Sequence, residues 1–169
     1  MDSKVEFLFL NEEDMIKAGV LDADRAVDTV GEVITLLSEG DYLMGGRAHN
    51  DHGVRLIFPE KSDIPNFPLA DSADRRFMAM PAYLGGRFHM CGEKWYGSNG
   101  NNRSIGLPRS ILMMMLNDVE TGKPLAYMSG NLLSSMRTGA MPGLAAKLLA
   151  RDEKRYSHWS APESYADQA

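Results

Sequence analysis

Residues 110–129 read SILMMMLNDVETGKPLAYMS, two apolar runs joined by a polar turn. The two runs, residues 110–117 and 125–129, are rich in aliphatic, methionine and aromatic side chains, as is typical of β-strands. Between them, Gly122 can adopt the positive φ that many turns require, and Pro124 restarts the extended chain. The stretch therefore predicts an antiparallel hairpin whose apolar strands need cover.

Four further segments have the composition of strands. They are residues 5–10, 54–58, 77–84 and 87–96, separated by loops that carry glycine or proline. With the hairpin and the helices described next, they predict an α/β fold with a mixed, largely antiparallel sheet and flanking helices.

Two helices are predicted before residue 41. Asn11 with Asp14 three residues later is a capping-box pattern for a short first helix. Asp22 or Asp24 begins a second helix with an apolar face, and Gly40 ends it.

A third helix is predicted from the apolar and small-residue pattern between Asn131 and Arg151. Asn131 is the expected N-cap. Pro142 is expected to break or kink the helix, because proline lacks the amide hydrogen that an interior helical position donates.

Composition limits the class of protein. A chain of 169 residues, 44% of them hydrophobic, predicts one domain that buries about 70% of its surface. Net charge −5 and a pI near 5.3 argue against nucleic acid or an anionic membrane as partner. The lone Cys91 excludes an intrachain disulfide and suits a reducing compartment. With no apolar run of about 20 residues and an acidic N-terminus, we expect a cytoplasmic protein.

Two basic residues, Lys94 and Arg137, stand among apolar or small residues rather than in charged runs. An unpaired buried charge is costly, so such cations are candidates for binding an anion. The alternative is that Lys94 extends from a strand edge into solvent and that Arg137 pairs with an acidic side chain. The pattern of residues leaves both interpretations open.

The longer pattern resembles the ornithine cyclodeaminase and mu-crystallin family of dinucleotide-dependent enzymes. The resemblance runs from Phe7 to Arg151, and its most specific parts are GEKWYGS (92–98), the LND…TG.PLA hairpin and the SSMRTGA…AAK helix. Within the family, the lysine-tryptophan and SSMRT segments look most similar to those of dehydrogenases that oxidise an amino-acid conjugate on the way to 2,3-diaminopropionate. The resemblance implies a small amino-acid substrate, NAD or NADP as cofactor, and a homodimer.

By resemblance, Arg47 and Arg137 clamp the substrate carboxylate, a task that suits the planar arginine fork. Lys94 is the implied catalytic residue, which hydrogen-bonds the carboxylate or activates water. Met80 is implied as a pocket residue, and Thr138 as a neighbour of the cofactor phosphates.

Other polar residues have simpler interpretations. His49 and His52 lack a third ligand, so no metal is assigned. The stretch from Ser98 to Asn102 is interpreted as a turn, and Met113–Met115 as core or interface residues.

Family members continue after the third helix with a strand and a glycine-rich turn that opens a Rossmann domain, and no such turn occurs here. The doublets at residues 45–46 and 85–86 do not open helices. We therefore expect residues 1–151 to be a substrate-binding and dimerisation domain, with residues 152–169 a tail of non-native or disordered character. A truncated gene product, by frameshift, is the accompanying hypothesis.

Three functions remain open. In the first, the chain is half of an NAD(P)-dependent amino-acid dehydrogenase or ammonia lyase. It would be inactive alone and is not expected to bind the dinucleotide. Alternatively, it is a non-catalytic binder of small amino acids or carboxylates of the mu-crystallin type. A third alternative is an inert remnant that dimerises through its sheet.

Overall fold

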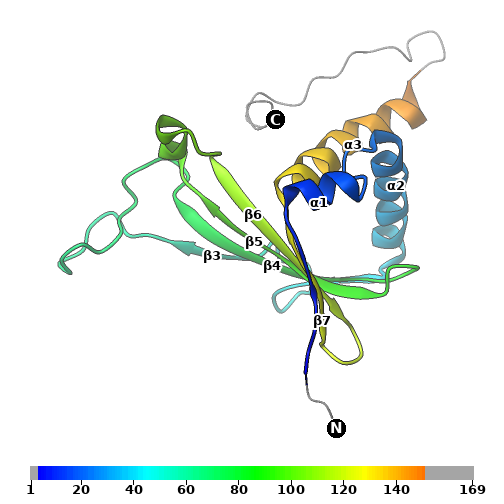
Figure 1. The fold of residues 1–169 in the computed structure, drawn as a ribbon, viewed down its shortest axis with the longest axis horizontal. Helices are drawn as coiled ribbons and strands as arrows, with labels where there is room; N and C mark the ends of the chain where they lie inside the picture. The colour runs from blue at the N-terminus through cyan, green and yellow to red at the C-terminus, as the bar shows by residue number, and fades with distance from the viewer. Residues whose placement is uncertain (1–3, 151–169) are drawn as a thin grey trace.

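The computed structural model describes residues 4–150, which form one seven-stranded sheet with helices at one end (Figure 1). The strand order is β1-β7-β6-β5-β4-β2, and β3 also pairs with β4. All pairs are antiparallel except β1 with β7. The prediction of a mixed, largely antiparallel α/β fold is confirmed. The strands are β1 Leu8–Leu10, β2 Tyr42–Met44, β3 Val54–Ile57, β4 Arg76–Leu84, β5 Met90–Ser98, β6 Ser110–Asp118 and β7 Pro124–Ser129.

The hairpin predicted from residues 110–129 is present as β6 and β7. Its turn places Gly122 at φ 71°, the left-handed conformation that glycine adopts without strain. Asp118 stabilises the turn by accepting hydrogen bonds from the backbone nitrogen and hydroxyl of Thr121. The local sequence was therefore sufficient to predict this pair of strands.

Three α-helices lie on one side of the sheet: α1 Glu12–Lys17, α2 Ala23–Glu39 and α3 Asn131–Leu149 (Figure 1). The predicted capping box of α1 is confirmed, since the Asn11 side chain accepts from Asp14 N at 3.0 Å and the Asp14 carboxylate accepts from Asn11 N at 3.1 Å. Asp22 caps α2, and Gly40 ends it at φ 77°. Helices α2 and α3 pack closely, because a Cβ on Gly143 would lie 2.9 Å from a methyl group of Val27.

The prediction that Asn131 caps α3 is wrong. Gly130 is the N-cap residue, and the Asn131 amide instead bonds to β6, accepting from Leu112 N at 2.8 Å and donating to Ser110 O at 3.1 Å. Strand β7 ends at Ser129, so the Asn131 side chain continues its hydrogen bonding along β6. The Asn131 side chain therefore hydrogen-bonds to backbone groups of β6 and not to the free backbone amides at the start of α3.

Other boundaries also differ from the predictions. Helix α3 continues through Pro142 as one element. Strand β5 begins at Met90, not at Arg87, because the preceding residues form a turn in which His89 has φ 38°. Strand β2 was not predicted, and a 3₁₀-helix at Gly100–Ile105 (η1) includes part of the stretch interpreted as a turn. The predicted tail, residues 152–169, lies outside the described residues.

The two faces of the sheet differ in cover. On the face beneath the helices, here called the helix face, Met80, Lys94, Met114 and Met128 form a row in register across β4, β5, β6 and β7. Met128 belongs to the core cluster with Met15 of α1 and Ala126. Within residues 4–150, no helix has the length and apolar character needed to cross a membrane.

The opposite face, here called the open face, carries large apolar side chains without cover in the described chain. Phe77, Trp95 and Ile111 are 39%, 43% and 46% exposed. The rings of Phe77 and Trp95 stack with centroids 5.8 Å apart. A cluster of this kind is typical of a protein–protein interface.

Candidate functional site

Lys94 lies in the middle of the sheet, on a strand that is paired on both sides. Its register neighbours on the helix face are Met80 of β4 and Met114 of β6, both uncharged. The interpretation that Lys94 extends from a strand edge is therefore wrong. In the described residues its amine has no hydrogen bond and no ion pair, and its ammonium lies 5.1 Å from the centroid of the Tyr96 ring.

The electrostatics of Lys94 follow from this position. Burial lowers the pKa of its amine below the ordinary lysine value, and the positive charge of Arg137 lowers it further. A carboxylate placed beside the two cations would reverse the second effect and restore the charged form. The site therefore has excess positive charge that favours an anion.

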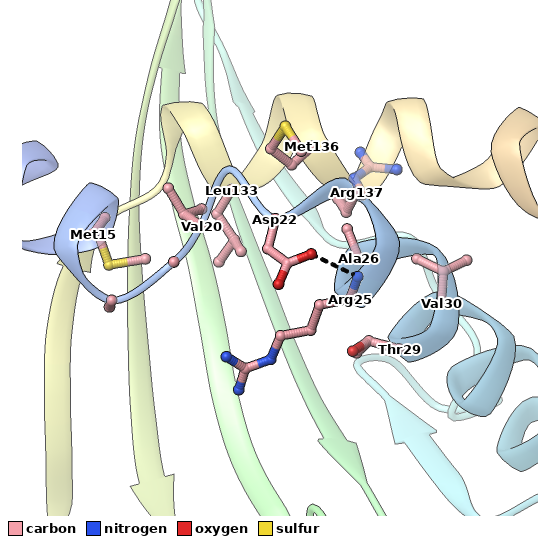
Figure 2. A pocket seen from close by; sticks show the side chains of 12 residues that line it. Met15, Val20, Asp22, Arg25, Ala26, Thr29, Val30, Leu133, Met136 and Arg137 are labelled. Carbon is pink, nitrogen blue, oxygen red and sulfur yellow. Dashed lines mark hydrogen bonds between the residues drawn. The ribbon is translucent and has the colours of Figure 1, made fainter.

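Arg137 extends from the second turn of α3 and is exposed. In residues 4–150 no acidic side chain pairs with it, so the alternative of an ordinary ion pair is not observed there. It lines a groove between α2, α3 and the turn that joins α1 to α2 (Figure 2). The groove has a volume of about 260 Å³ and is mostly apolar, with Met15, Val20 and Leu133 among its lining residues.

The acidic residue in this groove has a structural task. The Asp22 carboxylate accepts from the backbone nitrogen of Arg25 at 3.0 Å, which is the N-cap hydrogen bond of α2 (Figure 2). Arg25 also lines the groove, and like Arg137 it has no ion-pair partner in the described part.

Arg47 comes from a different part of the fold than Lys94 and Arg137. It is exposed in the turn between β2 and β3, where Gly45 and Asp51 form an isolated bridge. The end of this turn approaches Met80, because a Cβ on Gly53 would lie 2.9 Å from its Cγ. The fold thus brings the Arg47 turn to the sheet edge beside Met80, without a recorded contact of the Arg47 side chain.

Thr138 follows Arg137 on α3. Its hydroxyl donates to the Ser134 carbonyl at 2.7 Å, so its proton is used within the helix. Among the predicted site residues, Met80 is the register neighbour of Lys94 and Arg137 lies near enough to lower its pKa, whereas no contact joins Arg47 or Thr138 to Lys94 in the described residues.

Sequence reasoning missed a polar network on the helix face. The Asp74 carboxylate accepts from Arg76, from Arg109 and from Ser98 Oγ, the last at 2.6 Å. Arg76 also donates to the Tyr96 hydroxyl at 3.3 Å. Ser98, interpreted as part of a turn, is the buried last residue of β5. These residues come from the turn before β4 and the start of that strand, from β5, and from the residue before β6, so no local motif indicates that they meet.

No group of three or more metal-binding side chains (His, Cys, Asp or Glu) occurs among residues 4–150. Neither glycine doublet opens a helix there: Gly85 and Gly86 form the turn between β4 and β5, and Gly45 and Gly46 form the turn after β2. A glycine-rich phosphate cradle at a helix N-terminus is therefore absent from the described part of the chain.

Comparison with known proteins agrees with the geometry. N-((2S)-2-amino-2-carboxyethyl)-L-glutamate dehydrogenase of Staphylococcus aureus is 37% identical over 147 residues, which are 86% of this chain and 40% of the relative. The structure of an archaeal alanine dehydrogenase dimer with bound NAD matches with TM-score 0.66 and 34% identity, covering 86% of this chain and 38% of that one.

A second solved structure is the Thermococcus litoralis Delta(1)-pyrroline-2-carboxylate reductase in complex with NADH and L-proline. It matches with TM-score 0.67 and 25% identity, over 86% of this chain and 38% of that one. The chain thus spans about two fifths of the length of the relatives it matches.

The family model for ornithine cyclodeaminase and mu-crystallin matches residues 22–156, a range that contains Lys94, Arg137 and every other predicted site residue. Members of this family include NAD-dependent amino-acid dehydrogenases and reductases and also cyclodeaminases. Because the family model covers most of the chain and the sheet matches solved relatives, this protein belongs to the ornithine cyclodeaminase/mu-crystallin family.

Proposed function

We propose that residues 1–151 are a substrate-binding and dimerisation unit that holds the α-carboxylate of a small amino acid. The observation that carries this proposal is the pair formed by Lys94 and Arg137. Both are cationic, they repel one another, and within the described residues neither has an acidic partner. An anion between them would relieve that repulsion, whereas a neutral ligand would not.

The two cations divide the work by their geometry. The planar guanidinium of Arg137 can bind both oxygens of a carboxylate, while Lys94 contributes a compact charge from the sheet below. Arg47, in its exposed turn, is the proposed third cation, and Met80 lines the apolar side. Because the pKa of Lys94 is lowered, its Nζ is better suited than an ordinary lysine to accept a proton from water.

In the full-length relatives we infer that oxidation of the amine-bearing carbon by NAD or NADP is followed by cyclisation with loss of ammonia or by imine hydrolysis. The described residues do not fit the dinucleotide, since they contain no glycine cradle. The Thr138 hydroxyl would have to leave the Ser134 carbonyl before donating to a phosphate. We therefore propose that this chain binds the substrate carboxylate, and we attribute no cofactor-dependent step to it.

A second candidate function is non-catalytic binding of small amino acids or carboxylates. Two observations favour it. The Lys94–Arg137 pair has no acidic partner among the described residues, and these residues contain no glycine cradle for a dinucleotide. The two candidates share the clamp and differ in whether this unit serves a catalytic protein.

We also infer a homodimer formed through the open face, in the cytoplasm. The support is the exposed Phe77–Trp95 stack, and the archaeal relative whose structure is a dimer. The acidic chain with a single cysteine suits a reducing compartment. The third alternative is an inert dimer that binds no ligand. Observing such a dimer would contradict the carboxylate clamp but not the proposed interface.

Isothermal titration tests the clamp. The chain is titrated with L-proline, L-alanine, L-ornithine and L-glutamate, each with and without NADH. Arg137→Met and Lys94→Met are each expected to weaken binding about tenfold to a hundredfold, the loss typical of one charge-assisted contact. Arg103→Met, which removes an exposed arginine from η1, is the matched control and should leave affinity unchanged.

The outcomes test the clamp that both candidates share. Binding that ignores NADH agrees with both candidates, because neither gives the described residues a cofactor site, whereas binding that requires NADH contradicts our account of the described residues. Absence of binding to all four amino acids, or equal affinity of both site variants and the parent chain, contradicts the carboxylate clamp.

A further inference from the structure

We propose that Tyr96 is a positioning residue for Lys94, with its ring oriented by Arg76 and Asp74. The proposal rests on the proposed function of Lys94 in a carboxylate clamp, and it adds the device that holds the amine in place. The Lys94 side chain is long and has no hydrogen-bond partner in the described part, so something else must restrict its rotamers.

The first step is the contact between lysine and ring. Lys94 and Tyr96 are two residues apart on β5, so both side chains project onto the helix face. The Lys94 Nζ lies 5.1 Å from the ring centroid, within the distance of about 6 Å at which the π-face attracts a cation. This attraction also favours the charged form of the amine, against the effects of burial and of Arg137.

The second step is the immobilisation of the ring. The Tyr96 hydroxyl accepts from Arg76 Nη2 at 3.3 Å and donates to Met78 Sδ at 3.2 Å. Met78 is 1% exposed, the most buried large side chain described. The Arg76 guanidinium carbon also lies 6.0 Å from the ring centroid. The ring is therefore held at its hydroxyl and beside its face, and it cannot turn away from Lys94 without breaking these contacts.

The third step is the anchoring of Arg76. Its guanidinium is paired with Asp74, which also binds Arg109 and Ser98. Arg109 in turn donates to Ser98 Oγ at 3.1 Å. The network thus connects the start of β4, the end of β5 and the residue before β6.

One feature of Arg76 indicates that it serves these partners rather than packing alone. Its Nε is buried and has no hydrogen-bond partner in the described structure, which is costly for a charged group. We interpret this to mean that the Nη contacts with Asp74 and Tyr96, and not the needs of Nε, determine the position of the guanidinium. The chain of contacts then runs Asp74, Arg76, Tyr96, Lys94.

Within residues 4–150, few charged and titratable groups lie near Lys94. On the strands, its register neighbours Met80 and Met114 are neutral, Tyr96 lies on its own strand, and the charge of Arg137 on α3 acts on it. Loss of the aromatic ring therefore removes the one contact of the ammonium with a stabilising group in this part of the chain. The pKa of Lys94 is then expected to fall.

Competitive labelling with acetic anhydride, followed by mass spectrometry, measures the reactivity of each lysine amine from neutral to alkaline pH in the full chain. In Tyr96→Leu, Lys94 should become about two- to thirtyfold more reactive at neutral pH, because the ring no longer stabilises the ammonium. Tyr96→Phe keeps the ring but loses both hydroxyl contacts that hold it, so it should change Lys94 in the same direction as Tyr96→Leu, by less. Arg76→Lys keeps the charge but not the fork, and should change Lys94 in the same direction as Tyr96→Leu, by less.

Tyr83→Leu is the matched control, since it removes a tyrosine from the adjacent strand on the open face. A general loosening of the sheet would raise Lys94 reactivity in this variant too, and that result overturns the proposal. Unchanged reactivity in Tyr96→Leu also overturns it, and unchanged reactivity in Arg76→Lys overturns the role of Arg76. If Tyr96→Leu does not fold, the Arg76→Lys and Tyr96→Phe pair carries the test.

The labelling readout needs no ligand, so the two proposals can fail separately. A shift in Lys94 reactivity together with absent amino-acid binding retains the positioning role and rejects the clamp. Amino-acid binding that depends on Lys94, without any effect of Tyr96 on its reactivity, retains the clamp and rejects the positioning role.

Discussion

Arg137 on α3 lies close enough to Lys94 on β5 for its charge to lower the pKa of the lysine amine. Two like charges held in proximity destabilise a fold unless an opposite charge compensates them or one of them is neutralised. An anionic ligand between the two cations, as proposed above, would relieve this repulsion.

Removal of the Lys94 charge should stabilise the folded chain at neutral pH. Its folded pKa lies below the ordinary value of 10.5, so between the two values the unfolded state binds more protons and stability rises with pH. Lys94→Met should raise Tm by a few degrees near pH 7, and the gain should shrink as the pH approaches 10.5. Thermal melts of both proteins across this range give the comparison, and a gain that grows with pH would contradict the assigned direction.

Removal of the Arg137 charge should move the pKa of Lys94 back toward its ordinary value, though burial keeps it lowered. Arg137→Met tests this by following the Lys94 side-chain NMR signals during a pH titration. Arg25→Met, which removes another cation from the same groove, is the control and should have the smaller effect. Equal shifts in both variants would mean that Arg137 has no particular relationship with Lys94.

The Asp74 network should be important for stability. Asp74→Asn removes the only acidic partner that the described structure records for Arg76 and Arg109, and should cost about 2–3 kcal/mol in the free energy of unfolding. Asp71→Asn breaks an exposed ion pair with Arg75 and should have no measurable effect. Urea denaturation of the three proteins checks the difference, and similar midpoints would show that the network contributes little.

Asn131 should matter as a link between α3 and β6 rather than as a cap. Asn131→Ala leaves Leu112 N and Ser110 O without the partner they have now, and should cost about 1–3 kcal/mol. Hydrogen exchange adds a site-specific readout, because the Leu112 amide should exchange faster in the variant. Asn117→Ala, which loses one bond in an exposed turn, should leave that amide protected.

The open face should control assembly. Trp95→Lys places a charge in the exposed aromatic stack and should convert a dimer to a monomer at micromolar concentration, measured by analytical ultracentrifugation. Ile105→Lys, at a residue that is 71% exposed on η1, should leave the assembly unchanged. A parent chain that is already monomeric, or a dimer that survives Trp95→Lys, would reject the open face as the interface.

Features with local causes were predictable. The β6–β7 hairpin followed from Gly122 and Pro124 between two apolar runs, and the start of α1 followed from Asn11 with Asp14. In these cases the groups that interact are at most a few residues apart, so the chain itself brings them together. Asn131 shows the limit of this reasoning, because a cap residue and a strand partner have the same sequence pattern.

The candidate site shows the same division. Composition and motif marked Lys94 and Arg137 as cations in unusual surroundings, and they related the chain to its family. Only the sheet register placed Met80 beside Lys94 and Tyr96 on the same face, and only the packing of α3 brought Arg137 close enough to lower the lysine pKa. Arg109 meets Asp74 because strands pair across long separations, which depends on the hydrogen bonding and burial of the whole sheet and not on any local pattern.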